Sequence, residues 1–427
     1  MPVGLSFRAL DEWSQGFQSA TTTGARGTFL LACWVQRYRV SCQPLREAPN
    51  AQVPVAEAYP VSPDGRAQSC RGGRLDLIGD VTIDSANQAI EGDNINVMAV
   101  VGDRGLIQKG FGTLVPTSLT IVAGIGTVTV SNISEFASLL RPEVFTVSSA
   151  GDVELGNVFM DGNTATVTSA GDILVTGALD DAGGDITLAS SAGSVTLQQA
   201  VSAAGSVDVA GTAVTSADTI QAAQDLTLTG SLSISVNGAV TTSVGDVTLN
   251  SAGSLIVNDT ISAAANASLV GNTIATTQAI EAGANVTVAA AQSVVLNGTV
   301  ASAGGDVVVS TSLASSGSDA VGVSITKAVT STESIIVASE GDVTIRDETL
   351  TPDSLIVTAN DVEVTSVNGG VLLDTIDVTG TRTVQDPTTG IDEIRAVFVS
   401  GGEDVAVSGA ITGGLQGGIS PTSTARP

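Results

Sequence analysis

Short runs in which apolar and polar residues alternate recur along most of the chain, and they predict β-strands. Examples are VTL at 195–197, LTL at 226–228, VTL at 247–249 and VVV at 307–309. A period of two is typical of strands, whereas an amphipathic helix repeats every three to four residues. Gly-Asp or Gly-Ser precedes many of these runs, for example at 184–185, 245–246 and 305–306. Because Gly, Asp and Ser all favour turns, the pattern predicts strands separated by tight corners.

The spacing of the corners reveals a repeat. The residues just before successive runs are Thr164, Asp172, Asp185, Ser194, Ser206, Ala213, Asp225, Ser233, Asp246, Ser254, Asn266, Thr273, Asn285, Ser293 and Asp306. Short steps alternate with long steps along this series, and each short-long pair spans about 20 residues, within the range of known repeat units. Sequence similarity is stronger between units that are three apart: Asn297–Val307 is identical to Asn237–Val247 at six of eleven positions. The chain is therefore predicted to be a repeat protein.

A coil of about 20 residues that contains three short strands predicts an all-β fold, the parallel β-helix or solenoid. Each coil would stack on the previous one at roughly 4.8 Å. Inward positions such as Ile186, Val207, Leu226 and Val247 would form an aliphatic core. A strict six-residue repeat would indicate a left-handed helix, and since it is absent we expect a right-handed one.

The chain divides into three predicted parts. Residues 1–74 form a leader or low-order segment, which holds both Trp and both Tyr and becomes Pro-rich from Pro44 to Pro63. Within it, Arg26–Trp34 resembles a signal-peptide core; the alternative is a poorly ordered leader that starts upstream of the true start. Residues 75–411 form the β-helical domain, most regular over 145–370, and residues 412–427 form a flexible tail.

Composition and charge narrow the function classes. The chain is 43% hydrophobic and 3% aromatic, and its longest apolar run, near Phe29–Val35, is too short to span a membrane. Residues 1–75 hold eight Arg against five acidic residues, whereas residues 76–427 hold eight basic against 38 acidic residues. Such a surface repels nucleic acids and anionic membranes. We therefore expect no nucleic-acid partner and no transmembrane segment.

Few residues offer chemistry. The chain has no His, which excludes Ser-His-Asp and Cys-His catalysis and His-ligated zinc. Paired carboxylates could hydrolyse glycosides, and the candidates are Asp180-Asp181 and the corner residues Asp185 and Asp246. Turn capping alone also predicts Asp after Gly at corners, and we favour that interpretation. We expect no catalytic, cofactor-binding or metal-binding residues and no enzymatic activity.

Two further features are weak signals for a bound metal. Gly-Gly-Asp at 183–185 and 304–306 resembles calcium-binding nonapeptide repeats, but the GGxGxDxU run that those repeats require does not occur. Cys33, Cys42 and Cys70 are the only cysteines, and their number and spacing define neither a disulfide framework nor a zinc site.

The repeat unit resembles the filamentous-haemagglutinin repeats of large bacterial secreted adhesins. Five SAGDVTL-like segments carry the resemblance, namely Ser149–Leu155, Ser169–Val175, Ser191–Leu197, Ser243–Leu249 and Ser251–Val257. The similarity covers roughly residues 145–370. It implies a right-handed β-helical shaft, export to the cell surface or medium through an outer-membrane secretion partner, and a role in attachment or biofilm matrix. The NPNL- or NPNG-type secretion domain of that family is not found near the start, which leaves the export route open.

Three functions remain in competition. The first is a non-catalytic structural or adhesin-like protein that presents a rod to host, cell-surface or extracellular carbohydrate or protein. The second is a β-helical carbohydrate-active enzyme, which needs acidic and basic or aromatic side chains gathered on one face. The third is a passive spacer within a larger assembly. We favour the first, because the body has few basic residues and its only aromatic residues are Phe111, Phe136, Phe145, Phe159 and Phe398.

Overall fold

The computed structural model describes strands and turns in two compact units, residues 1–184 and 185–427. The described residues are 6–9, 17–24, 27–36, 39–45, 75–77, 81–84, 95–97, 100–102, 118–123, 127–133, 144–160, 164–312, 322–346, 357–380, 382–385, 392–395, 397–408, 411–413 and 420–423. No helix occurs among them. The predicted all-β class is confirmed. Arg26, Cys70, Phe111 and Phe136 lie outside these residues.

The first unit contains an antiparallel sheet and a set of parallel strands. The antiparallel strands pair in sequence order: β1 (Ser6–Ala9), β2 (Phe17–Gly24), β3 (Gly27–Gln36) and β4 (Arg39–Leu45). These four strands fall within the predicted leader, and the signal-like apolar run lies in β3. The parallel strands are β5 (Leu75–Leu77), β6 (Val81–Asp84), β7 (Ile95–Val97), β8 (Val100–Gly102), β9 (Ser118–Val122), β10 (Val128–Ile133), β11 (Val144–Ser149), β12 (Val153–Met160), β13 (Thr164–Ser169), β14 (Ile173–Val175) and β15 (Leu179–Asp181).

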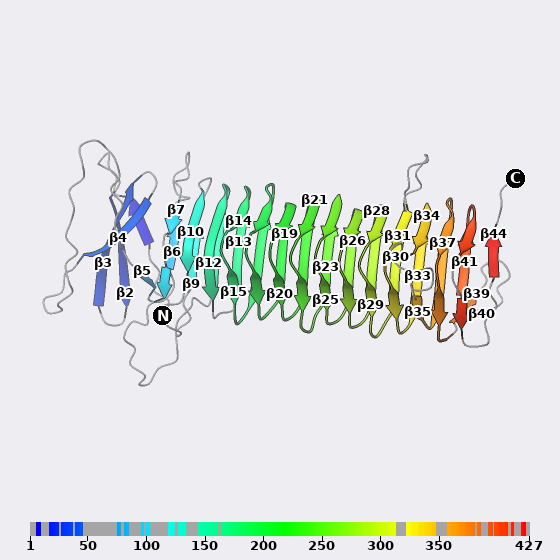
Figure 1. Cartoon of the computed structure of the whole chain (residues 1–427). Coiled ribbons are helices and arrows are strands. Elements are labelled where there is room, and N and C mark those ends of the chain that lie inside the picture. Colours follow the sequence, from blue (N-terminus) through cyan, green and yellow to red (C-terminus); the bar gives the residue numbers. More distant parts are fainter. Residues whose placement is uncertain are drawn as a thin grey trace, which may run out of the picture. The chain divides into compact units, whose positions relative to one another are not determined.

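The second unit is a parallel β-solenoid, and Figure 1 shows its strands as stacked arrows. The strand pairings assign the strands of each coil to three faces. Face A is formed by β16 (Asp185–Ser190), the first halves of β19 (Val207–Ser216), β21 (Leu226–Val236), β26 (Ala267–Thr276) and β28 (Val286–Leu296), then β23 (Val247–Ser251), β30 (Val307–Thr311), β33 (Ser334–Ser339), β36 (Asp361–Ser366), β41 (Val397–Gly401) and β44 (Ser420–Ser423). Strand β44 lies within the predicted tail.

The other two faces complete each coil. Face B contains the second halves of the four long strands together with β17 (Val195–Leu197), β24 (Ser254–Val257), β31 (Gly322–Ile325), β34 (Asp342–Ile345), β37 (Val371–Leu373) and β42 (Val405–Val407). Face C contains β18 (Val201–Ala203), β20 (Ile220–Ala222), β22 (Val240–Thr242), β25 (Ile261–Ala263), β27 (Ile280–Ala282), β29 (Val300–Ser302), β32 (Val329–Ser331), β35 (Val357–Ala359), β38 (Ile376–Val378) and β43 (Ile411–Gly413).

The core is an aliphatic ladder in which equivalent residues of successive coils stack. Ile186 pairs with Val207, Val207 with Leu226, and Leu226 with Val247, so each pairing advances the chain by one coil. All four side chains are at most 1% exposed. Burial of each contributes roughly 1.5–3 kcal/mol. The predicted inward positions and the predicted coil length are confirmed, and the right-handed winding stays a prediction.

The corner between faces A and B differs among the coils. Strands β19, β21, β26 and β28 run through it without a break, as 10 or 11 residues each. A register shift, as in a β-bulge, lies between Gly211 and Ala213 and again between Gly271 and Thr273. A bulge bends a strand without ending it. In these four coils face A therefore turns into face B within one strand, whereas in the other coils two strands form the two faces.

Three late coils are longer than the others. Val307 pairs with Ile335, Ile335 with Val362, and Val362 with Val397, and the last of these steps is the longest. That step contains an antiparallel hairpin of β39 (Arg382–Gln385) and β40 (Asp392–Arg395). The sequence pattern breaks over 380–397 because of this hairpin, and face A resumes directly afterwards with β41.

Candidate functional site

The recurrent polar residues at the corner that leads into face A bind the backbone of the next coil. We call these positions the corner ladder; they are Asp185, Ser206, Asp225, Asp246, Asn266, Asn285, Asp306 and Ser334. Asp and Asn at these positions supply the accepting oxygens, while Ser206 and Ser334 contribute backbone N–H groups. Asp185 Oδ1 accepts a hydrogen bond from the Ser206 N–H at 2.7 Å, and Asp225 Oδ1 accepts one from the Asp246 N–H at 2.9 Å. Each bond joins equivalent positions of neighbouring coils. The carboxylates therefore cap backbone groups that the strands leave unpaired.

Asp and Asn serve the same purpose in the middle of this ladder. Asp246 Oδ1 accepts from both the backbone N–H and Nδ2 of Asn266, at 2.8 and 2.9 Å. Asn266 Oδ1 accepts from the same two groups of Asn285, at 3.1 and 3.0 Å. Asn285 Oδ1 accepts from the Asp306 N–H, and Asp306 Oδ1 accepts from the Ser334 N–H, both at 2.9 Å. Since an amide oxygen replaces a carboxylate oxygen here, the ladder needs an acceptor rather than a charge.

The Gly in the recurrent Gly-Asp pair is explained by the same contacts. A Cβ on Gly245 would lie 2.3 Å from Asp225 Oδ1, and a Cβ on Gly305 would lie 2.3 Å from Asn285 Oδ1. The capping oxygen of one coil thus occupies the space that a side chain on the next coil would need. The Gly-Asp pair, which we considered above as a calcium or catalytic signal, thus meets a packing requirement of the corner ladder.

Asp180 and Asp181, the candidate carboxylate pair, point to opposite sides of β15. Successive side chains of a strand alternate between its faces. Asp180 is half-buried on the outer side, and Asp181 is fully buried. Asp181 Oδ1 accepts hydrogen bonds from the N–H groups of Gly183 and Gly184, both at 3.1 Å. Two carboxylates on opposite sides of a strand do not flank one glycosidic bond, so this pair does not form the arrangement that hydrolysis requires.

A second ladder follows the corner between faces B and C. Asn258 Nδ2 donates to Asn237 Oδ1 at 2.8 Å, and Asn237 Nδ2 donates to the Ser216 carbonyl at 3.2 Å. Farther along, Thr326 Oγ1 donates to Asn297 Oδ1 at 3.2 Å. The polar side chains of this corner also bind neighbouring coils, so they stabilise the stack.

Acidic residues between these ladder positions cap their own turns. Asp218 Oδ1 accepts from the Thr219 N–H, and Asp259 Oδ1 accepts from the Thr260 N–H, each at 2.7 Å. Asp208, in contrast, is exposed on the outer side of β19, and partial desolvation raises the pKa of its carboxyl above the ordinary value.

Two buried carboxylates were not predicted from the sequence. Asp361 is 6% exposed and its Oδ1 accepts from Ser334 Oγ at 2.7 Å, while Asp374 is 4% exposed and contacts the Ser408 hydroxyl. Asp361 pairs in register with Ser334, so it occupies the position that continues the corner ladder. One of the long coils separates the two and hides this equivalence in the sequence. No His in the chain could serve as a base for either serine.

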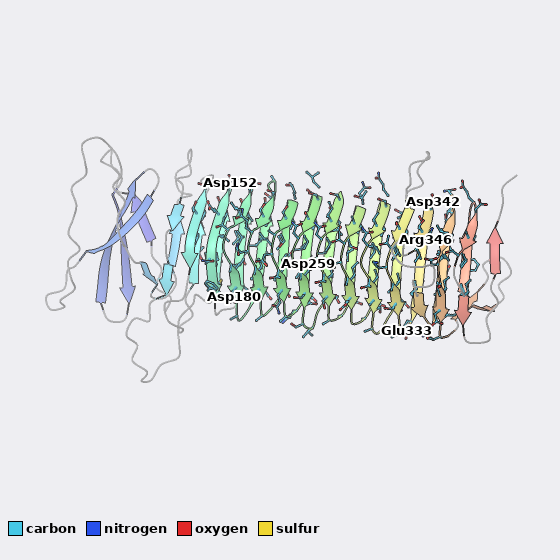
Figure 2. All side chains as sticks on the ribbon, in the orientation of Figure 1. Asp152, Asp180, Asp259, Glu333, Asp342 and Arg346 are labelled. Atoms are coloured by element: carbon cyan, nitrogen blue, oxygen red, sulfur yellow. The ribbon has the colours of Figure 1, made fainter. Side chains whose placement is uncertain are left out.

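Charged residues of the second unit are dispersed over several corners. Figure 2 shows Asp342 along one edge of the stack and Glu333 along the opposite edge, with Asp259 and Arg346 between them. Among the residues that the structure describes, no three His, Cys, Asp or Glu side chains form a group that could hold a metal ion. The described part of the chain also contains no helix of the length and apolarity needed to cross a membrane.

The comparisons with known proteins give no relative. No family model matches the chain, no curated protein matches it, and no solved structure matches it. Site geometry and sequence pattern therefore provide the indications of function.

Proposed function

We propose that this chain is a non-catalytic β-helical protein of the cell surface or medium, with a structural or adhesin-like role. The observation that carries the proposal is the corner ladder. The carboxylates that recur often enough to suggest a site, such as Asp185 and Asp246, accept hydrogen bonds from the backbone of the next coil. Side chains used in this way stabilise a stack of coils, and such a stack presents long, regular outer faces.

The outer faces offer little to a carbohydrate-active enzyme. Sugar binding favours exposed aromatic rings, yet Phe145 is fully buried and Phe398 is only partly exposed. The resemblance of segments such as Ser243–Leu249 to filamentous-haemagglutinin repeats supports an exported, attachment-related role. We expect contacts with extracellular or cell-surface carbohydrate or protein, and an outer-membrane partner for export.

Two assays test the proposal. The first incubates the purified full chain with a panel of acidic and neutral polysaccharides and measures reducing ends; we expect none above the level of a heat-denatured control. Clear turnover would favour the enzyme instead. The second compares surface attachment and biofilm mass of cells that make the chain with cells that lack it, alongside fractionation of the chain. An intracellular chain with unchanged attachment would contradict the adhesin-like role.

A further inference from the structure

One side of the second unit carries no charge over six consecutive coils. This surface begins at the second outward position of face A, crosses the corner between faces A and B and ends with face B; we call it the neutral flank. It comprises residues 189–197, 210–216, 229–236, 250–257, 270–276 and 289–296, all of which the structure describes. The absence of charge here is unusual in a chain whose net charge is −27.

Every charge of these six coils lies elsewhere. Residues 189–308 contain seven charged side chains, all acidic: Asp208, Asp218, Asp225, Asp246, Asp259, Glu281 and Asp306. They lie on face C, at its two corners or at the start of face A. The neutral flank is therefore the one side of this segment on which a second acidic body could approach without meeting a like charge.

The neutral flank also exposes large apolar side chains. The described residues include five exposed large hydrophobic side chains, and three of them lie on this flank within three successive coils. Leu232 is 67% exposed, Ile256 is 40% exposed and Val270 is 38% exposed. Around them, the outward positions are Ala, Ser, Thr, Val, Asn and Gln, which can pack closely or form hydrogen bonds. Val270 lies on face A, Ile256 on face B and Leu232 at the corner between them. Exposed apolar groups with a polar surround are typical of interaction sites.

The size of the neutral flank fits a pair of chains. Six coils at about 4.8 Å, and up to eight residues per coil at about 3.3 Å, give roughly 700 Å² per copy. Full contact of two such surfaces on both faces would bury up to about 1,400 Å² in total, within the range of about 1,200–2,000 Å² of specific interfaces. On either side of the corner, the sheet face of one copy can pack on that of another copy at about 10 Å separation.

We propose that the neutral flank is a self-association surface, on which a second copy of this chain packs its own neutral flank. The arrangement is isologous, so each copy contributes the same residues to the other. Apolar contact drives it and repulsion between the acidic parts of the two copies opposes it. Salt screens that repulsion, so association strengthens as salt rises.

Sedimentation analysis of the full chain tests the proposal, over a wide range of concentration and at low and high sodium chloride. Thr215→Glu places a carboxylate on the neutral flank, and Thr241→Glu is the matched control on face C. Both residues are outward and half-buried at the centre of a strand segment, with uncharged residues on the adjacent coils. Ile256→Glu is a second flank variant. Circular dichroism establishes that each variant is folded.

We expect a concentration-dependent dimer that tightens with salt. Both flank variants should weaken its Kd by about tenfold or more, because they bury an unpaired charge, and the face C control should leave it unchanged. A wild-type chain that stays monomeric throughout would overturn the proposal. Equal weakening by Thr241→Glu would also overturn it. Association that salt abolishes would overturn it too, and would point instead to contact between the basic residues 1–75 of one copy and the acidic coils of another.

Discussion

Substitution of Asp246 distinguishes a structural role of this residue, as a backbone cap, from a chemical role. Asp246 Oδ1 accepts two hydrogen bonds from Asn266, at 2.8 and 2.9 Å, and Asp246→Ala removes both. A hydrogen bond contributes about 0.5–1.5 kcal/mol net, and loss of a helix N-cap, a similar side-chain-to-backbone contact, costs about 0.5–2 kcal/mol. Because the site is half-buried, water replaces part of what is lost. We expect Asp246→Ala to lower the free energy of unfolding by about 1–2 kcal/mol.

Asp246→Asn is the matched variant. It keeps the acceptor oxygen, and Asn266 and Asn285 already occupy the equivalent position in the next two coils. It also removes one negative charge next to Asp225 on the adjacent coil. We expect a change within about 0.5 kcal/mol of wild type.

Urea unfolding followed by circular dichroism measures both variants, with amide exchange at Asn266 as a local readout, because repeat proteins can lose coils separately. If Asp246→Asn costs as much as Asp246→Ala, the ladder needs the charge itself, and a bound cation or a chemical role would replace the capping account. If both variants match wild type, the hydrogen bonds contribute nothing measurable and the account is wrong.

Three further predictions concern the core and one outer carboxylate. Val247→Asp, at a position 0% exposed, should lower the thermal midpoint sharply because it buries an unpaired charge, whereas the outward Thr248→Asp should change it little; equal melting would contradict the register. Among the described residues Thr276 Oγ1 is buried without a hydrogen-bond partner, so Thr276→Val should raise the free energy of unfolding by about 1 kcal/mol. Ser216→Ala removes the 2.7 Å hydrogen bond from Ser216 Oγ to the Asp218 carbonyl and should lower the free energy of unfolding by a similar amount. Urea unfolding measures both variants. The raised pKa of Asp208 means that the folded state holds the carboxyl proton more tightly than the unfolded state, so the contribution of Asp208 to stability falls as the pH rises through and above about 3.8. Asp208→Asn should remove this pH dependence and raise the free energy of unfolding at neutral pH by at most about 0.5 kcal/mol. Thermal melting at a series of pH values measures both effects.

The coil architecture could be predicted because it depends on the local periodicity of apolar and turn residues. Strand alternation identified the inward residues, and the corner spacing placed even the inconspicuous Ala213 and Thr273, which pair in register with Ser233 and Ser254. These features depend on neighbouring residues only, so a single sequence carries them. The sequence similarity between units three apart also has a simple origin, since the core ladder leads from Leu226 to Val286 in three pairings, through Val247 and Ala267.

Features that depend on neighbouring coils could not be predicted in the same way. The sequence placed a corner at Ala213, and the structure has a bulge within one continuous strand, because Gly211 bends β19 without ending it. The buried Asp361 was missed because a long coil interrupts the spacing. Alternation identifies outward positions, but the neutral flank appears only when the register shows which outward positions of different coils are neighbours.

Residue-level hydrogen exchange at the corner-ladder amides shows whether the recurrent Asp and Asn side chains cap the backbone of the next coil. If they do, five backbone N–H groups should exchange as slowly as the amides of the core strands, because an oxygen of the preceding coil holds each of them. These are the N–H groups of Ser206, Asp246, Asn266, Asn285 and Asp306. Exchange at the rate of unprotected turn amides would contradict this capping, because the recurrent Asp and Asn side chains would then be free for another role.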